Sequence, residues 1–149
     1  MQRILVADDG SDAALSAVEI AVTLAAQAHA ELIALAVVDP RRIRPADVSA
    51  LARSEHLNDA EAAENLADAS ADYLKRCQER AIDAGVARYR EARRVSEDAV
   101  LEIIDYATAH DVDLIVVGSR GRGRLPGLLL GSVSQKLATH APCSVLIAR

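Results

Sequence analysis

Residues 4–38 read ILVADDGSDAALSAVEIAVTLAAQAHAELIALAVV, and two hydrophobic patterns alternate along this stretch. Residues 4–7 form a short apolar run that a polar turn ends, as expected of a buried strand. Apolar residues then recur at helical spacing, at positions Leu15, Val18, Val22 and Ala25. A second apolar run covers residues 32–38 and stops at Asp39 and Pro40. The order strand, helix, strand predicts a βαβ unit with parallel strands.

The same alternation continues to the end of the chain. We predict a helix from residue 59 to Gly85, an edge strand over 86–93, a helix capped by Ser96, a strand over 113–118, a helix over 132–140 and a last strand over 144–148. Residues 40–58 are polar and Arg-rich, which favours a mobile connection; one helical turn within it and a role as a lid are both left open by the sequence. The sequence therefore predicts one α/β domain over residues 1–149, an open parallel sheet with helices on both faces.

Composition and charge narrow the class of partner. The chain of 149 residues has no Phe and no Trp, so its core must be aliphatic. The net charge of −5 opposes an extended contact with nucleic-acid phosphates. The N-terminus meets charge too early for a signal peptide, and no apolar run is long enough to span a bilayer. We therefore expect a cytoplasmic protein with no nucleic-acid and no membrane partner.

Cysteines and histidines give no sign of a disulfide framework or a metal site. Cys77 and Cys143 lie far apart in the sequence, and no CxxC spacing occurs. The four histidines are scattered in the same way, at positions 29, 56, 110 and 140. We interpret all six residues as structural or surface residues.

The segment that carries chemistry is residues 118–134, GSRGRGRLPGLLLGSVS. Five glycines lie between a predicted strand and a predicted helix, and glycine lets main-chain N–H groups approach a ligand closely. The start of the helix adds unpaired N–H groups, a partial positive charge and serine hydroxyls. These are the parts of a phosphate site. No glycine precedes a lysine, which excludes a P-loop, and the spacing does not fit the dinucleotide fingerprint.

The glycines instead fit the pattern G-x2-G-x9-G-[S/T], which Gly118, Gly121, Gly131 and Ser132 satisfy. This pattern resembles the ATP signature of the universal stress protein family. The opening strand and turn (residues 4–11), the strand before the loop (113–121), and residues 130–134 and 140–143 are also similar to that family. The resemblance spans the chain and is weakest between residues 40 and 95.

The resemblance implies a Rossmann-like, adenine nucleotide α-hydrolase-like sheet of order 3-2-1-4-5. Its topological switch lies between strands 1 and 4, where open α/β sheets bind ligands. By the resemblance, Asp9 contacts the ribose or adenine side of an adenine nucleotide, Ala7 lines the pocket, Val37 meets the adenine edge, and Val117 and Gly118 form the floor under the ribose. The implied phosphate ligands are Gly121, Gly131, Ser132, Val133 and Ser134. The nucleotide is ATP, or AMP or another adenine nucleotide, with or without Mg²⁺.

The sequence departs from the family pattern in three places. Asp8 replaces a residue that is usually small or apolar, and strand alternation directs it away from Asp9. It is a structural or surface residue, a solvent or partner contact, or a helper for magnesium. Ser144 stands where a proline commonly precedes the last strand. The loop is rich in arginine, and Arg120, Arg122 and Arg124 are either phosphate clamps or solvated side chains.

The resemblance favours a stress-response regulatory protein that binds ATP and acts through its conformation or through an unidentified regulatory partner, and is not an enzyme. Two alternatives remain open at this point: a slow ATPase or phosphotransferase, and a nucleotide-free dimeric adaptor. The family also implies a homodimer, in which the last strand, Ser144–Ala148, pairs with its copy in a second chain.

Overall fold

The computed structural model describes the chain except for residues 43–48, 50–51, 54–55, 57, 59–68 and 122–129. The predicted mobile connection falls largely on these ranges, as does the predicted start of the helix at residue 59. Arg122 and Arg124 also lie outside the described residues.

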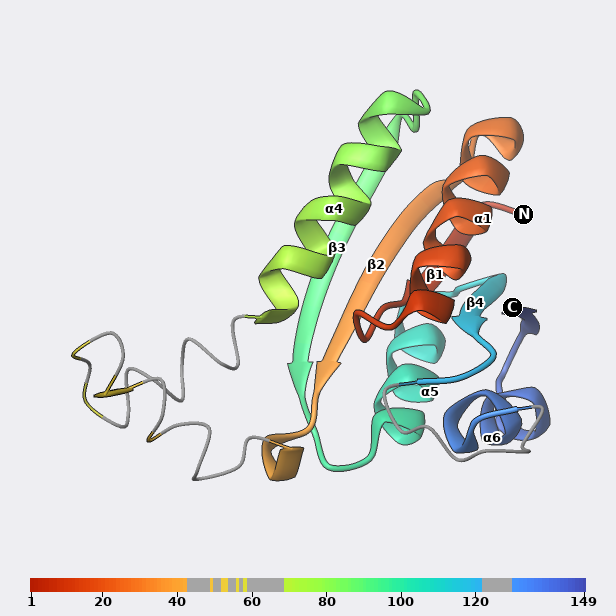
Figure 1. Cartoon of the computed structure of the whole chain (residues 1–149). Coiled ribbons are helices and arrows are strands. Elements are labelled where there is room, and N and C mark those ends of the chain that lie inside the picture. The colour runs from red at the N-terminus through yellow and green to blue at the C-terminus, as the bar shows by residue number, and fades with distance from the viewer. Residues whose placement is uncertain (43–48, 50–51, 54–55, 57, 59–68, 122–129) are drawn as a thin grey trace.

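Five parallel strands form one sheet in the order β3-β2-β1-β4-β5. The strands are β1 (Arg3–Ala7), β2 (Glu31–Val38), β3 (Arg88–Val95), β4 (Leu114–Gly118) and β5 (Ser144–Ala148). The helices are α1 (Asp12–Ala28), η1 (Pro40–Arg42), α4 (Ala69–Asp83), α5 (Ala99–Ala109) and α6 (Ser132–His140). Figure 1 shows how strands and helices alternate along the chain. The predicted fold class and strand order are confirmed.

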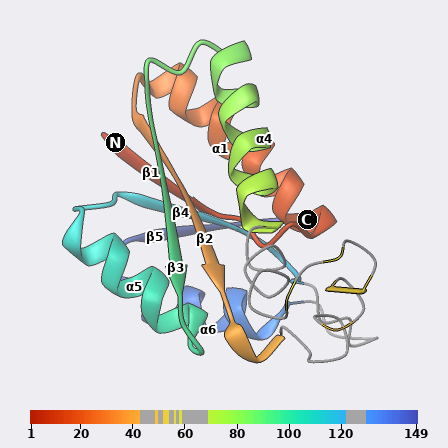
Figure 2. The ribbon, with the colours of Figure 1, turned by 90° about the vertical axis from the view of Figure 1, so that its left-hand side faces the viewer.

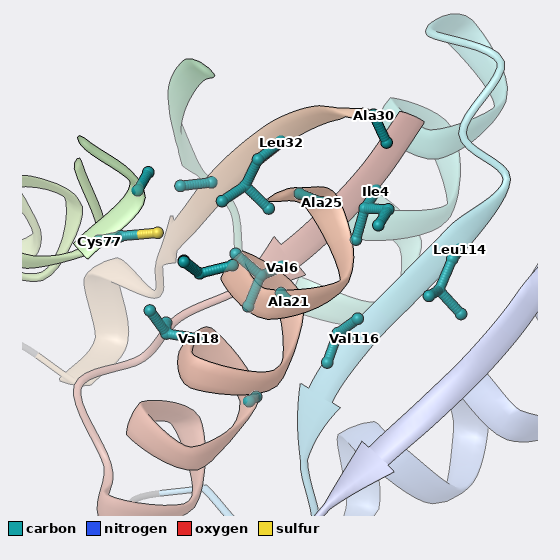
Figure 3. Close-up of a cluster of buried hydrophobic side chains, with 14 of the residues drawn as sticks. Ile4, Val6, Val18, Ala21, Ala25, Ala30, Leu32, Cys77, Leu114 and Val116 are labelled. Carbon is teal, nitrogen blue, oxygen red and sulfur yellow. The ribbon is translucent and has the colours of Figure 1, made fainter. Parts of the chain in front are cut away.

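Helices cover both faces of the sheet, as predicted (Figure 2). On one face, α1 and α4 bury aliphatic residues against alternate positions of β1, β2 and β4 (Figure 3). On the other face, α5 and α6 pack on the intervening positions. The largest side chains with less than 2% exposure are Ile4, Leu5, Leu32, Ile33, Leu35, Ile115 and Leu137. Central strands that are buried on both sides explain why the apolar runs in the sequence are continuous.

Two local predictions need correction. Strand β3 begins at Arg88, two residues after the predicted start, because the N–H of Val86 still bonds to Ala81 and completes the end of α4. Gly85 has φ +74°, as predicted for that helix end. The N-cap of α5 is Asp98 and not Ser96: the Asp98 carboxylate accepts hydrogen bonds from the N–H groups of Val100 and Leu101, both at 3.1 Å.

The carboxylate of Asp113 joins the starts of β1 and β4. It accepts hydrogen bonds from the N–H groups of Gln2 at 2.6 Å and Arg3 at 2.9 Å. These bonds hold the pKa of Asp113 below its usual value. A lowered pKa in the folded state contributes stability above the unfolded-state pKa of about 3.9, and the contribution is lost as the pH falls through the folded-state value.

We therefore expect Asp113→Asn to lower the urea midpoint of unfolding at pH 7, and the difference from the wild type to shrink below about pH 4. Urea titrations at pH 7 and pH 3 measure this. Asp105→Asn, which removes an exposed carboxylate on α5, is the matched control and should show no such pH-dependent difference. An Asp113→Asn difference of equal size at both pH values would contradict the assignment.

Among the helices of the described residues, none is long and apolar enough to cross a membrane.

Candidate functional site

The carboxyl ends of β1, β2 and β4 bring three predicted site residues to one face of the sheet. Ala7 is in register with Val117 on one side and with Leu35 on the other, and Val37 lies two residues beyond Leu35. Ala7, Val37 and Val117 all belong to the apolar cluster under α5 and α6. The face that the sequence assigned to the base and ribose is therefore continuous and apolar.

Asp9 lies where the loop after β4 comes closest to β1. A Cβ atom at Gly121 would be 2.7 Å from Oδ2 of Asp9, so a larger residue at this position would require the Asp9 side chain to move. The other carboxylate oxygen of Asp9 accepts a hydrogen bond from the N–H of Ser11 at 3.0 Å. Asp9, which follows β1, and the glycine-rich loop, which follows β4, thus meet at the switch point, as the strand order requires.

Gly118 has a different neighbour from the one that the sequence suggested. A Cβ atom there would lie 2.6 Å from the carbonyl carbon of Ala13 and 2.8 Å from the N atom of Ala14. The missing side chain therefore makes room for the main chain of the first turn of α1. Gly118 positions α1 against β4, and any contact that it makes with a ribose must come from its main chain.

The start of α6 lies against the same loop. Gly131 is the N-cap of α6, and no side chain caps the helix at this position. Its N–H donates to the carbonyl of Ser119 at 2.6 Å, and a Cβ atom at Gly131 would lie 3.3 Å from the Cα atom of Arg120. Because φ is −75°, space and not conformation favours glycine here.

The first turn of α6 contains Ser132, Val133 and Ser134. Their N–H groups have no intrahelical acceptor, because the first intrahelical bond runs from the N–H of Gln135 to the carbonyl of Gly131, at 3.0 Å. Ser132 is exposed and Val133 is half-buried. Ser134 is buried, and its hydroxyl lies 3.1 Å from the carbonyl of Ser119 and 3.0 Å from that of Gly131. The Ser134 hydroxyl therefore holds the loop to the helix, while its N–H group is still available to an anion.

Asp8 is a structural residue, and a role as a solvent contact is wrong. It is 4% exposed, and its carboxylate accepts a hydrogen bond from the N–H of Gly10 at 2.8 Å. Burial raises the pKa of the Cys77 thiol on α4 to about 12, and the negative charge of Asp8 adds to this increase. The Asp8 carboxylate therefore lies on the α4 side of the sheet. The ring of Tyr73, also on α4, lies against Gly10, which has φ +76°. Asp8 therefore supports the turn that presents Asp9.

Ser11 is a residue of the site whose full role the sequence did not show. Its hydroxyl caps the N–H of Ala14 at 3.2 Å. The same hydroxyl lies 3.3 Å from the carbonyl of Arg120, and so links α1 to the glycine-rich loop. A cap of this kind is visible in a sequence, but its contact with a residue 109 positions away is not.

In the described part of the chain, no group of three or more His, Cys, Asp or Glu side chains could hold a metal ion. Asp9 is a carboxylate of the candidate site that could contact a cation. A cation held there would need its other ligands from a bound molecule or from water.

The order of the sheet, together with the loop and helix start at its switch point, defines the adenine nucleotide α-hydrolase-like class of fold. The chain belongs to the universal stress protein family, whose model matches residues 1–149. It is 34% identical to the universal stress protein YxiE of Bacillus subtilis over 148 residues, which cover 99% of this chain and 98% of the relative.

Solved structures of the family have the same fold. Universal stress protein UspA from Lactobacillus plantarum is 28% identical, with a TM-score of 0.81 over 99% of this chain and 97% of that one. A universal stress protein in complex with cAMP is also 28% identical, with a TM-score of 0.70 over 99% of this chain and 96% of that one.

Proposed function

We propose that this protein binds an adenine nucleotide, and ATP in particular, between Asp9 and the start of α6. The observation that carries the proposal is the contact of three separate segments at the switch point: Gly121 touches Asp9, and Gly131 touches residues 119–121. A structure of similar fold and 28% identity is a complex with cAMP, which supports an adenine nucleotide as the ligand.

Each part of the nucleotide has a complementary surface. The half-buried Ala7 and Val37 and the buried Val117 offer an apolar floor to the base and ribose. Asp9 offers a carboxylate to the ribose hydroxyls. The N–H groups of residues 132–134 point out of the N-terminus of α6 and offer hydrogen bonds and a partial positive charge to phosphate oxygens. A micromolar affinity corresponds to about −8 kcal/mol, which such contacts can supply.

In this proposal the bound nucleotide is read out by conformation or by a partner protein and is not turned over. Phosphoryl transfer needs a group that positions the attacking nucleophile, and usually metal ligands as well. Of the two adjacent carboxylates, Asp8 is directed towards α4, so Asp9 alone faces the loop. A single carboxylate is a sparse set of protein ligands for metal-assisted transfer.

We expect no steady-state release of γ-phosphate from ATP with Mg²⁺ present, above the rate that Asp9→Asn gives. A coupled phosphate-release assay on both proteins, at saturating ATP, measures this. Robust ATP turnover that depends on Asp9 would show that the protein is a slow ATPase and not a regulatory binding protein.

The outer edge of β5 is the surface proposed for a homodimer. In the described part of the chain β5 pairs with β4 alone, and Val145, Leu146 and Ile147 are half-buried in the single chain. Pairing with a second copy would cover this edge. We place the protein in the cytoplasm, where adenine nucleotides are abundant.

Native mass spectrometry of the purified protein tests the proposal and identifies the ligand. We expect a dimer that carries the added mass of an adenine nucleotide, and calorimetry with ATP, AMP and cAMP then ranks the candidates. A protein that co-purifies with no nucleotide and binds none of the three would instead be a nucleotide-free adaptor.

A further inference from the structure

A pocket lies between the first turn of α1 and the start of the glycine-rich loop. It has a volume of about 370 Å³ and is lined by Asp12, Ala13, Ser16, Ser119, Arg120 and Arg149. Figure 2 shows the C-terminal end of the chain beside the N-terminal turn of α1, and residues of both line this pocket. We call this the α1–β5 pocket. Among the described residues, its lining shares none with the proposed nucleotide site.

We infer that the α1–β5 pocket is a separate binding site for a phosphoryl group. The inference goes beyond the proposed nucleotide function and does not depend on it. The phosphoryl group is either free inorganic phosphate or the terminal phosphate of a nucleotide, and the experiment below distinguishes these sources.

Two arginines give the pocket its positive charge. Among the described residues, neither Arg120 nor Arg149 forms an ion pair, whereas several other arginines of this acidic chain do. The paired arginines are Arg3, Arg41, Arg80, Arg90 and Arg94. A guanidinium presents a planar fork of N–H donors that matches the oxygens of a phosphate. Two such forks at one pocket are therefore available to an anion.

Ser119 lines the pocket, and its hydroxyl forms no hydrogen bond within the described part of the chain. The residue is 6% exposed, and its main chain is fully engaged. Its N–H donates to Ala148 at 2.6 Å, and its carbonyl accepts from Gly131 and from Ser134. These bonds fix the main chain of Ser119 at the pocket wall, so its hydroxyl is available to donate a hydrogen bond to a ligand there.

The first turn of α1 adds a partial positive charge to the pocket. This helix has 17 residues, so its N-terminus carries the partial positive charge of a full helix dipole, and Ala13 of that turn lines the pocket. The hydroxyl of Ser16 makes only a long contact, 3.5 Å from the carbonyl of Asp12, and can turn towards a ligand.

Asp12 is the negative side chain in the lining. Its charge offsets one of the two arginines, so the side chains that line the pocket sum to +1 (2 − 1), in a chain whose side chains sum to −5. An anion should therefore bind with a characteristic dependence on charge: removal of an arginine weakens binding, and removal of the Asp12 carboxylate strengthens it. A general attraction to the protein surface would not distinguish these positions.

The test is a titration of ¹⁵N-labelled full-length protein with inorganic phosphate at constant ionic strength, followed by amide chemical shifts. We expect saturable shifts at Ala13, Ser16 and Ser119. Arg149→Gln should weaken binding at least about fivefold and Asp12→Asn should tighten it at least about twofold. Arg88→Gln removes the same charge from the opposite edge of the sheet and should change nothing.

Two further arms complete the test. Ser119→Ala should weaken phosphate binding. The melting temperature of this variant should stay near that of the wild type, because the Ser119 hydroxyl bonds to no described residue. If ATP but not free phosphate shifts Ala13 and Ser16, the phosphoryl group is that of a nucleotide. The inference is overturned if neither ligand shifts these amides, or if Arg88→Gln and Arg149→Gln weaken binding equally. Shifts at residues 132–134 alone would support the nucleotide site and overturn this one.

Discussion

Gly131→Val is expected to weaken ATP binding at least about 100-fold, or roughly 2.7 kcal/mol. A Cβ atom at this position would already lie 3.3 Å from the Cα atom of Arg120 and 3.4 Å from the carbonyl oxygen of Ser119. Valine adds two methyl groups beyond that atom, and they must push the loop away from α6. The N–H groups of residues 132–134 would then no longer face Asp9 across the site.

Gly131→Ala is the matched control, because it shares the loss of glycine at an N-cap but adds one methyl group that needs only a few tenths of an ångström. We expect it to lose less than about tenfold in affinity. Isothermal calorimetry gives both values, and circular dichroism shows that the variants are folded. Full ATP affinity in a folded Gly131→Val protein would show that the start of α6 is not part of the ATP site.

Gly118→Ala is expected to cost about 3 kcal/mol of folding free energy, at the upper end of the usual cost of overpacking. The added methyl group would lie 2.6–2.8 Å from main-chain atoms of Ala13 and Ala14, and a helix backbone cannot rotate away as a side chain can. The first turn of α1 would have to lift off β4. A loss of this size lowers the melting temperature by about 6–12 °C in a domain of this length.

Gly85→Ala provides the comparison for this prediction. Gly85 has φ +74° with open space around it, so alanine there meets only the conformational penalty, about 1 kcal/mol. Thermal and urea unfolding of both variants separate a steric cost from a conformational one. Equal losses at the two positions would show that α1 does not press on Gly118 as described.

Much of the fold could be predicted because the sheet is buried on both faces. The continuous apolar runs of β1, β2 and β4 and the helical spacing of α1 are direct consequences of that burial, and α6 and β5 have the predicted bounds. The start of β3 was less predictable, because an edge strand with many charges has a weak pattern. The cap of α5 was ambiguous since Ser96 and Asp98 are both good N-cap residues.

The candidate site could be predicted in its parts but not in their roles. The glycine spacing located the loop, and the strand order placed it opposite Asp9. The sequence could not show that Gly118 makes room for α1, that the Ser134 hydroxyl holds the loop to α6, or that Asp8 is buried on the α4 side. Each of these depends on which atoms meet across a long separation in sequence, and spacing alone carries no such information.

The position of the nucleotide is tested most directly by amide chemical shifts during a titration of the ¹⁵N-labelled protein with ATP. The proposed site predicts that the largest shifts occur at Gly121, Gly131 and residues 132–134, with a smaller response at Asp9, and that Gly131→Val removes them. Saturable ATP binding that leaves these amides unmoved would contradict the account.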